Sequence, residues 1–273
     1  MKNVIKLALG AVVLGVVGLT SCGKSWSPIP DDATTITVAA SPSPHAEILE
    51  AAKPIFESKG YTLIIKQYTD YVQPNIATEN GSVDANYFQH TPYLNSFNEE
   101  NNTHLVSVGK VHYEPFAIYK GKKNSLEELS DGDTILVPND TTNEARALNL
   151  LADAGLITLK NGVGLEATKL DITSNPHNFN IKELEAQQIA SNRVDAAIAV
   201  INGNYALDAG LTSSDAIRYE SSDSLAADTY ANVLCVRDGN QNHKAIKALY
   251  EVLTSDKIKE FIKTRYNGAV LAI

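Results

Sequence analysis

Cysteine is scarce in this 273-residue chain, which contains only Cys22 and Cys235. Folds that rest on a disulfide framework carry several pairs of cysteines. The surroundings of Cys22 favour another role, described below, which leaves Cys235 without a partner. Cys235 also lies in the apolar run 232–236, which predicts a buried strand where a thiol behaves as a small hydrophobic side chain. We therefore expect no disulfide framework.

Basic residues are also few, because 23 lysines and arginines face 32 acidic residues and give a formal net charge of -9. This balance argues against nucleic acid or an anionic bilayer surface as the partner. The sequence also lacks a Gly-x-Ser-x-Gly elbow and a His-Glu-x-x-His helix. Because no activated nucleophile and no organised acid–base pair can be named, we expect a binding protein that is not an enzyme and carries no cofactor.

The first residues indicate the compartment. A short, positively charged start precedes an apolar stretch, 7–19, which is too short and too interrupted by glycine to predict a membrane span. Small residues then precede Cys22, as in a lipobox; a cysteine beside an ordinary cleavage site is the alternative. We predict a signal peptide over 1–22, a lipid on Cys22 and a tether over 23–33. Such a protein would be anchored in the cell membrane or the outer membrane and face the periplasm or the cell exterior.

Strand and helix patterns alternate along the rest of the chain. Strands separated by helices of this length predict an α/β fold with mainly parallel sheets flanked by helices. Two extended crossings, near 111–119 and 217–230, divide the chain into three blocks. The simplest assembly is a two-lobed clamp, with one lobe over 34–116 plus 228–273 and the other over 117–227. Such folds bind ligands where strands end and helices begin.

Six histidines raise the question of a metal site. His45 with Glu47, and His112 with Glu114, each offer two ligands from one turn or strand face. Zinc sites need three or four ligands at organised spacing, and the sequence has no histidine-rich loop. We therefore expect no resident metal, and the capture of zinc or manganese stays an alternative function.

A segment rich in rings, Asn86-Tyr-Phe-Gln-His-Thr-Pro-Tyr93, ends a predicted strand and opens a predicted helix. With Tyr71 upstream, it brings the rings of Phe88, His90 and Tyr93 toward one strand end. Aromatic rings offer broad apolar faces and polar edges, which suit a flexible or sulfur-bearing side chain. Ordinary core packing is the alternative, and for Phe88 the spacing by itself favours it.

Arg146 lies one turn into a helix whose start carries a capping box, Thr141 to Glu144. Backbone N–H groups and the helix dipole make such an end suitable for anions. An arginine beside it can hold a carboxylate in a bidentate fork, and Asn143 could share this task. A solvated helix arginine is the alternative.

Two asparagines stand at or within apolar strands. Asn202 follows the apolar run 197–201, and Asn232 interrupts the run 230–237. A polar amide in such a place needs hydrogen-bond partners. The ammonium or carboxylate of a ligand would be one such partner, and the backbone of a loop would be another.

Together these segments resemble the methionine-binding lipoproteins of ABC importers, the NlpA-type family, over 36–273. Five matches in chain order are more specific than any one of them. The matching stretches are Asp70-Tyr-Val-Gln-Pro-Asn75, Val83-Asp-Ala-Asn-Tyr-Phe-Gln-His-Thr-Pro-Tyr-Leu94, Val137-Pro-Asn-Asp-Thr-Thr-Asn-Glu-Ala-Arg-Ala147, Ala199-Val-Ile-Asn-Gly-Asn-Tyr205 and Tyr230-Ala-Asn-Val233.

The resemblance implies a periplasmic-binding-protein-like clamp that closes on one amino acid, with methionine as the expected ligand. It also implies delivery of that ligand to a membrane permease with its ATPase, by a protein that we expect to be a monomer. The implied site has an aromatic wall, an arginine for the carboxylate with a neighbouring asparagine, and two amides for the head group: Tyr71, Phe88, His90 and Tyr93; Arg146 and Asn143; Asn202 and Asn232.

Three positions depart from the family pattern. Thr141 stands where proline is usual, Ala145 where glycine precedes the arginine, and Gly203-Asn204 where hydroxyl residues are common. None removes an implied contact, but they leave room for another amino acid, either methionine enantiomer or a short peptide. A surface adhesin-type lipoprotein that binds no small molecule is a further alternative.

Overall fold

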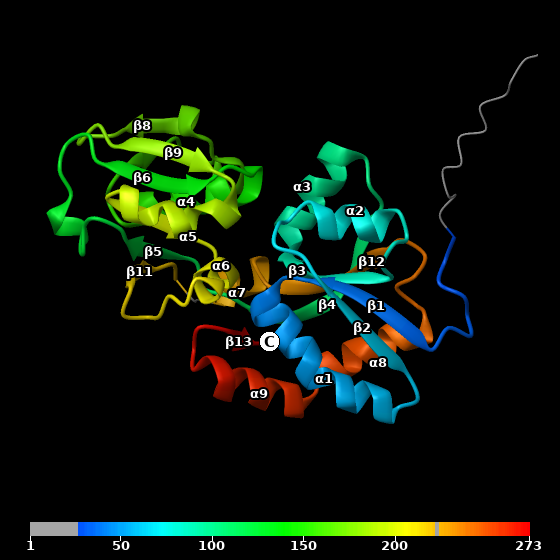
Figure 1. Cartoon of the computed structure of the whole chain (residues 1–273). Helices are drawn as coiled ribbons and strands as arrows, with labels where there is room; N and C mark the ends of the chain where they lie inside the picture. The colour runs from blue at the N-terminus through cyan, green and yellow to red at the C-terminus, as the bar shows by residue number, and fades with distance from the viewer. Residues whose placement is uncertain (1–26, 222–223) are drawn as a thin grey trace, which may run out of the picture.

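The structure is a computed structural model that describes residues 27–221 and 224–273. The predicted signal peptide over 1–22, with its lipidation site Cys22, lies outside the described residues, as does the beginning of the predicted tether. The described chain forms two lobes, each built on its own β-sheet, and the chain crosses between them twice (Figure 1).

The first lobe has a six-stranded sheet in the order β13-β4-β12-β3-β1-β2. Its strands are β1 (Thr35–Ala40), β2 (Thr62–Gln67), β3 (Ala85–His90), β4 (Leu105–Tyr113), β12 (Asn232–Arg237) and β13 (Leu271–Ala272). The helices around it are η1 (Pro42–Ala46), α1 (Glu47–Ser58), α2 (Gln73–Glu79), α3 (Thr91–Asn101), α8 (Lys244–Leu253) and α9 (Asp256–Tyr266). α1, α8 and α9 pack together on one face because each is amphipathic and buries its apolar stripe there.

The second lobe has a five-stranded sheet in the order β11-β5-β10-β6-β9, with a small β7-β8 pair beside it. Its strands are β5 (Ala117–Lys120), β6 (Thr134–Pro138), β7 (Thr158–Leu159), β8 (Ile172–Ser174), β9 (Asn180–Leu184), β10 (Ile198–Ile201) and β11 (Ala216–Tyr219). The helices are α4 (Thr141–Asp153), α5 (Ala186–Asn192) and α6 (Gly203–Asp208), with short turns η2 (Leu126–Glu128), η3 (Gly164–Glu166), η4 (Lys169–Asp171) and η5 (Arg193–Asp195). α7 (Ser224–Thr229) leads back to β12.

The predicted two-lobed α/β class is confirmed, but the sheets are mixed rather than mainly parallel. β1 pairs in parallel with β2 and β3, and β6 pairs in parallel with β9 and β10. β12 is antiparallel to β3 and β4, and β5 is antiparallel to β10 and β11. The reason is the connectivity. The chain passes from the first lobe to the second after β4 and returns before β12, so these neighbouring strands run in opposite directions. In the same way, the chain enters the second lobe at β5 and leaves it after β11, so these two strands are also antiparallel.

The described end of the predicted tether is bound to the first lobe and does not hang free. Ile29 is buried in the core of that lobe, and its backbone N–H donates to Asn240 Oδ1 at 3.0 Å. His243 Nε2 lies 2.9 Å from the carbonyl oxygen of Pro30. The tether was predicted from its polar and proline-rich composition. That composition gave no sign that its one isoleucine, Ile29, is buried in the core.

Gly109 on β4 lies beneath the ring of Tyr250 on α8, where a Cβ atom would stand 2.2 Å from Cζ of that ring. The same ring is held by a hydrogen bond from its hydroxyl to the carbonyl oxygen of Lys110 at 3.2 Å. The glycine is therefore required by the close approach of helix and strand.

We predict that Gly109→Ala lowers the free energy of unfolding by about 1–3 kcal/mol, because an extra methyl group in a packed interface forces the ring aside. Urea unfolding followed by circular dichroism measures this. The double variant Gly109→Ala/Tyr250→Ala is the control, since removal of the ring removes the collision. If the loss of unfolding free energy in the double variant equals the sum of the losses in the two single variants, the packing argument is contradicted.

Candidate functional site

A small pocket lies between the two lobes and is lined by residues of both. All eight residues predicted for the site line it: Tyr71, Phe88, His90, Tyr93, Asn143, Arg146, Asn202 and Asn232. Four further residues complete the lining: Gln89, Glu114, Gly203 and Asn204.

The first wall is built where β3 ends and α3 begins. His90 caps α3, because its Nδ1 accepts the backbone N–H of Tyr93 at 3.1 Å. Burial and, second to it, the nearby charge of Arg146 lower the pKa of His90 to about 3, so the ring is neutral. A neutral ring that accepts at Nδ1 carries its hydrogen on Nε2, and this atom lies 3.1 Å from Asn143 Oδ1 across the pocket.

The second wall begins at the N-terminus of α4, where the cap differs from the predicted one. Asp140, rather than Thr141, is the N-cap, and its Oδ1 accepts the backbone N–H of Asn143 at 3.0 Å. The amide nitrogen of Asn143 also donates to Asp140 at 2.9 Å. The side-chain oxygen of Asn143, Oδ1, accepts from His90 and, at 2.9 Å, from Asn202 Nδ2. Asn143 therefore holds both walls and the end of β10 in one network.

The four predicted rings converge, as the ring-rich segment 86–93 at the end of β3 and the start of α3 indicated. The ring of Tyr71 lies 5.8 Å from that of Phe88 and 5.6 Å from that of Tyr93. The Tyr93 hydroxyl donates to the carbonyl oxygen of Tyr71 at 3.2 Å. Phe88 is buried and packs with Tyr93 and Phe97. The result is an apolar wall whose polar edges are already hydrogen-bonded within the protein.

Side chains from the two lobes also meet directly at this wall. The Tyr71 hydroxyl donates to Asn204 Oδ1 at 2.6 Å, and the Tyr205 hydroxyl donates to the carbonyl oxygen of Thr69 at 3.1 Å. Tyr71 and Thr69 precede α2 in the first lobe, whereas Asn204 and Tyr205 lie in α6 of the second. The structure therefore shows the lobes closed on the pocket.

Arg146 is not a solvated helix arginine, because only 5% of its surface is exposed. Its Nε donates to Glu220 Oε2 at 2.9 Å, and its Nη2 bonds to the other carboxylate oxygen of Glu220 and to the carbonyl oxygen of Glu114. The guanidinium also lies over the rings of Tyr230, at 4.1 Å, and Phe116, at 4.7 Å. Burial alone would lower the pKa of Arg146, but Glu220 raises it, so the group stays charged.

Two amide atoms at the pocket have no hydrogen-bond partner within the described part of the chain. They are Asn202 Oδ1, an acceptor, and Asn204 Nδ2, a donor. Buried amide atoms in folded proteins are nearly always hydrogen-bonded. Both residues line the pocket, so a small ligand with one donor and one acceptor group would satisfy them.

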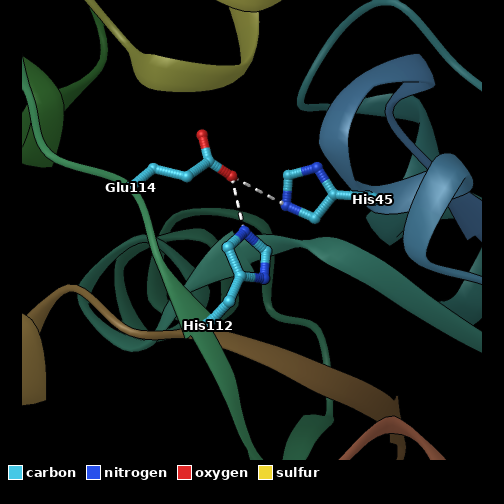
Figure 2. A group of neighbouring side chains, drawn as sticks. All are labelled: His45, His112 and Glu114. Carbon is cyan, nitrogen blue, oxygen red and sulfur yellow. Dashed lines mark hydrogen bonds and ion pairs between the residues drawn. The ribbon is translucent and has the colours of Figure 1, made fainter. Parts of the chain in front are cut away.

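A cluster of three buried ionisable side chains adjoins the pocket: His45, His112 and Glu114 (Figure 2). Glu114 Oε1 lies 2.7 Å from His112 Nε2 and 3.3 Å from His45 Nε2. His45 Nε2 is also 2.9 Å from Asn232 Oδ1. These side chains are of types that bind metal ions, and their candidate ligand atoms lie within 4.8 Å of one another. Glu47, the fourth residue that the sequence offered as a possible metal ligand, bonds to Arg265 and Tyr266 instead.

The comparison with known families decides the class of the chain. Residues 36–273 match the family model described as NlpA lipoprotein. The chain belongs to the NlpA lipoprotein family.

Relatives from this family match over their whole length. The methionine-binding lipoprotein MetQ of Bacillus subtilis (strain 168) is 43% identical and is aligned over 98% of this chain and 98% of that protein. The D-methionine-binding lipoprotein MetQ of Salmonella typhimurium is 39% identical over 97% of this chain and 96% of its own length.

Solved structures of NlpA-type proteins share the fold. A lipoprotein from Ruminococcus gnavus ATCC 29149 has a TM-score of 0.87 and 58% identity, over 88% of this chain and 100% of that one. A nutrient binding protein from Burkholderia cenocepacia bound to methionine has a TM-score of 0.82 and 39% identity, over 87% of this chain and 99% of that one.

Five residues of the site were not predicted from the sequence. Four of them line the pocket, and the fifth, Glu220, holds Arg146: Gln89, Glu114, Gly203, Asn204 and Glu220. Gln89 lies within the ring-rich segment, but its amide bonds to Asn75 and Asn86, away from the wall. Glu114 was weighed only as a metal ligand. Its position within an otherwise apolar and aromatic run, 111–119, was the signal that a carboxylate would be buried there. Glu220 gave no local signal, because its partners lie far away in the sequence.

The described part of the chain contains no helix that is both long enough and apolar enough to cross a membrane.

We predict that His45, His90 and His112 stay neutral well below the ordinary histidine pKa. Burial lowers their pKa values to about 4, 3 and 3, so protonation is favoured only in the unfolded chain. Each ring therefore stabilises the fold above the unfolded pKa, about 6.5, and loses that contribution as the pH falls toward its folded pKa. NMR of the imidazole resonances, assigned with single His→Gln variants, checks this. A buried ring that titrates near its ordinary pKa would contradict it.

Proposed function

We propose that this chain is the substrate-binding lipoprotein of an ABC importer, which captures one amino acid, with methionine as the expected ligand. The observation that carries the proposal is the two-sided pocket. One side is an apolar wall of rings with satisfied polar edges, and the other offers a charged guanidinium with unpaired amide atoms. An amino acid with a long apolar side chain has the same two-sided character.

The apolar end suits the methionine side chain. Tyr71, Phe88 and Tyr93 present ring faces and edges, which make favourable contacts with a polarisable thioether. Burial of such a side chain contributes roughly 1.5–3 kcal/mol. The small volume of the pocket favours a single amino acid over a peptide.

The polar end suits the head group. Arg146 uses Nε and Nη2 within the protein, and we assign its Nη1 to the carboxylate of the ligand. Asn204 Nδ2 would donate to the same carboxylate, and Asn202 Oδ1 would accept from the ammonium. Asn232, held by His45, would complete the grip from the first lobe. Charge-assisted hydrogen bonds of this kind contribute roughly 1.5–3 kcal/mol each.

The lobes that we propose to open and close are 34–116 plus 228–273 and 117–227. A lipid on Cys22 would hold the monomer at the cell membrane or the outer membrane, and the closed form would deliver the ligand to the permease and its ATPase. The relatives support this role, since two of them are named as methionine-binding or D-methionine-binding lipoproteins. The methionine in the structure from Burkholderia cenocepacia supports the same ligand. No catalytic role is proposed.

The deciding experiment is mass spectrometry of whatever small molecule the purified full-length protein releases on denaturation. We expect methionine in near-stoichiometric amount, because the lobes are closed on a buried pocket. Release of another amino acid would keep the class of the protein and change its specificity. If nothing is released, calorimetric titration with amino acids, short peptides and zinc follows, and silence toward all of them would refute the proposed function.

We predict that Arg146→Ala and Asn232→Ala each weaken methionine binding at least about tenfold, since each removes a hydrogen-bonding group that reaches the head group. Isothermal titration calorimetry measures the affinity, and circular dichroism confirms that each variant is folded. Arg218→Ala and Asn192→Ala are the matched controls, because both residues are exposed and outside the pocket lining. Near-native affinity in both site variants would refute the site assignment.

A further inference from the structure

We propose that Glu114 is the counter-ion for the ammonium group of the bound amino acid, and that His45 and His112 position it. This assignment rests on the proposed function and deepens it. Glu114 lies between β4 and β5, where the chain crosses from one lobe to the other. It is 6% exposed and is the one carboxylate among the residues that line the pocket.

One oxygen of the carboxylate is hydrogen-bonded to His112 and lies against His45. The Tyr87 hydroxyl bonds to His112 Nδ1, which places the imidazole hydrogen on Nε2 when the hydroxyl donates. His112 Nε2 then donates to Glu114 Oε1 at 2.7 Å. His45 Nε2, at 3.3 Å, faces the same oxygen. The hydrogen bond from His112 and the close packing of His45, whose Nε2 is 2.9 Å from Asn232 Oδ1, therefore orient the carboxylate without a charged partner.

The other oxygen faces the second lobe. Figure 2 shows it directed away from both imidazole rings. It borders Gly203 at the start of α6, where a Cβ atom would lie 2.9 Å from Oε2 and 2.8 Å from Glu114 Cβ. A side chain at Gly203 would displace the carboxylate. This oxygen therefore lies against Gly203, the residue between the two asparagines with unpaired amide atoms, Asn202 and Asn204.

The charges around the pocket favour a cation next to Glu114. The positive charge of Arg146 is already matched by the two-point contact with Glu220. The side chain that donates to the Glu114 carboxylate is the neutral ring of His112, and Arg146 bonds to the backbone carbonyl of Glu114 and not to its carboxylate. A buried carboxylate without a cation in direct contact is costly, and an ammonium group supplies that contact. A zwitterionic ligand would thus place its carboxylate toward Arg146 and its ammonium toward Glu114.

The test compares two ligands that differ only in the amino group: L-methionine and its des-amino analogue, 4-(methylthio)butanoic acid. Calorimetry on the full-length protein in detergent, freed of bound ligand, measures both affinities for wild type and Glu114→Gln. We expect the variant to bind methionine at least about tenfold more weakly and to bind the analogue within about threefold of wild type. The exposed residue Glu50, changed to Gln, is the matched control and should alter neither affinity.

Glu114→Asp supplies a second variant in case Glu114→Gln does not fold. It keeps the charge but withdraws it from the pocket, so it should lose affinity for methionine and not for the analogue. Equal losses for both ligands would show a structural role only and would overturn the assignment. So would unchanged methionine binding in Glu114→Gln, or wild-type binding that a chelator abolishes, which would assign the cluster to a metal ion. If wild type binds no amino acid at all, the proposed function fails as well.

Discussion

The carboxylate of Glu220 is the contact on which the site and the joint between the lobes both depend. It accepts from Arg146 Nε at 2.9 Å, from the Tyr113 hydroxyl at 2.6 Å and from the backbone N–H of Phe116 at 2.8 Å. Tyr113 ends β4 and Phe116 precedes β5, whereas Glu220 itself follows β11. One side chain therefore ties both crossings between the lobes to the first turns of α4. Because removal of one partner from a buried pair leaves an uncompensated charge, this junction tolerates little change.

The parts of the site that sequence could predict are those with a local pattern. Phe88 and His90 share a strand end with a helix start, and Arg146 follows a helix start, so each stands where α/β folds gather ligand contacts. Their partners are set by tertiary structure instead. Glu220 lies 74 residues beyond Arg146, and its role exists only because the chain crosses between the lobes twice. Glu114 was visible as an acid in an apolar run, but not as a pocket residue, because α6 brings the other half of its surroundings.

The order of the strands and helices and the α/β class of the fold were also predictable from local patterns. Hydrophobic period and glycine or proline breaks are local, and they locate strands and helices. Strand direction at a lobe crossing is not local, and the antiparallel pairs of β4 and β5 escaped the pattern. Asp140 replaced Thr141 as the cap of α4 because both are good caps and only the backbone conformation selects between them. The burial of Ile29 likewise depends on a distant partner, Asn240.

The hydrogen bonds described above that join the lobes across the pocket link uncharged groups, which bears on how a ligand controls closure. Across the wall of rings, Tyr71 reaches Asn204 and Tyr205 reaches Thr69, and each such hydrogen bond contributes only about 0.5–1.5 kcal/mol net. These bonds alone favour the closed form modestly. The zwitterionic ligand that we propose would add charge-assisted contacts to Arg146 in the second lobe and to groups of the first lobe at once, and those contacts would form only when the lobes meet. A ligand shifts a conformational equilibrium by its difference in affinity for the two states, so the paired charges of the head group, more than the apolar side chain, couple binding to closure.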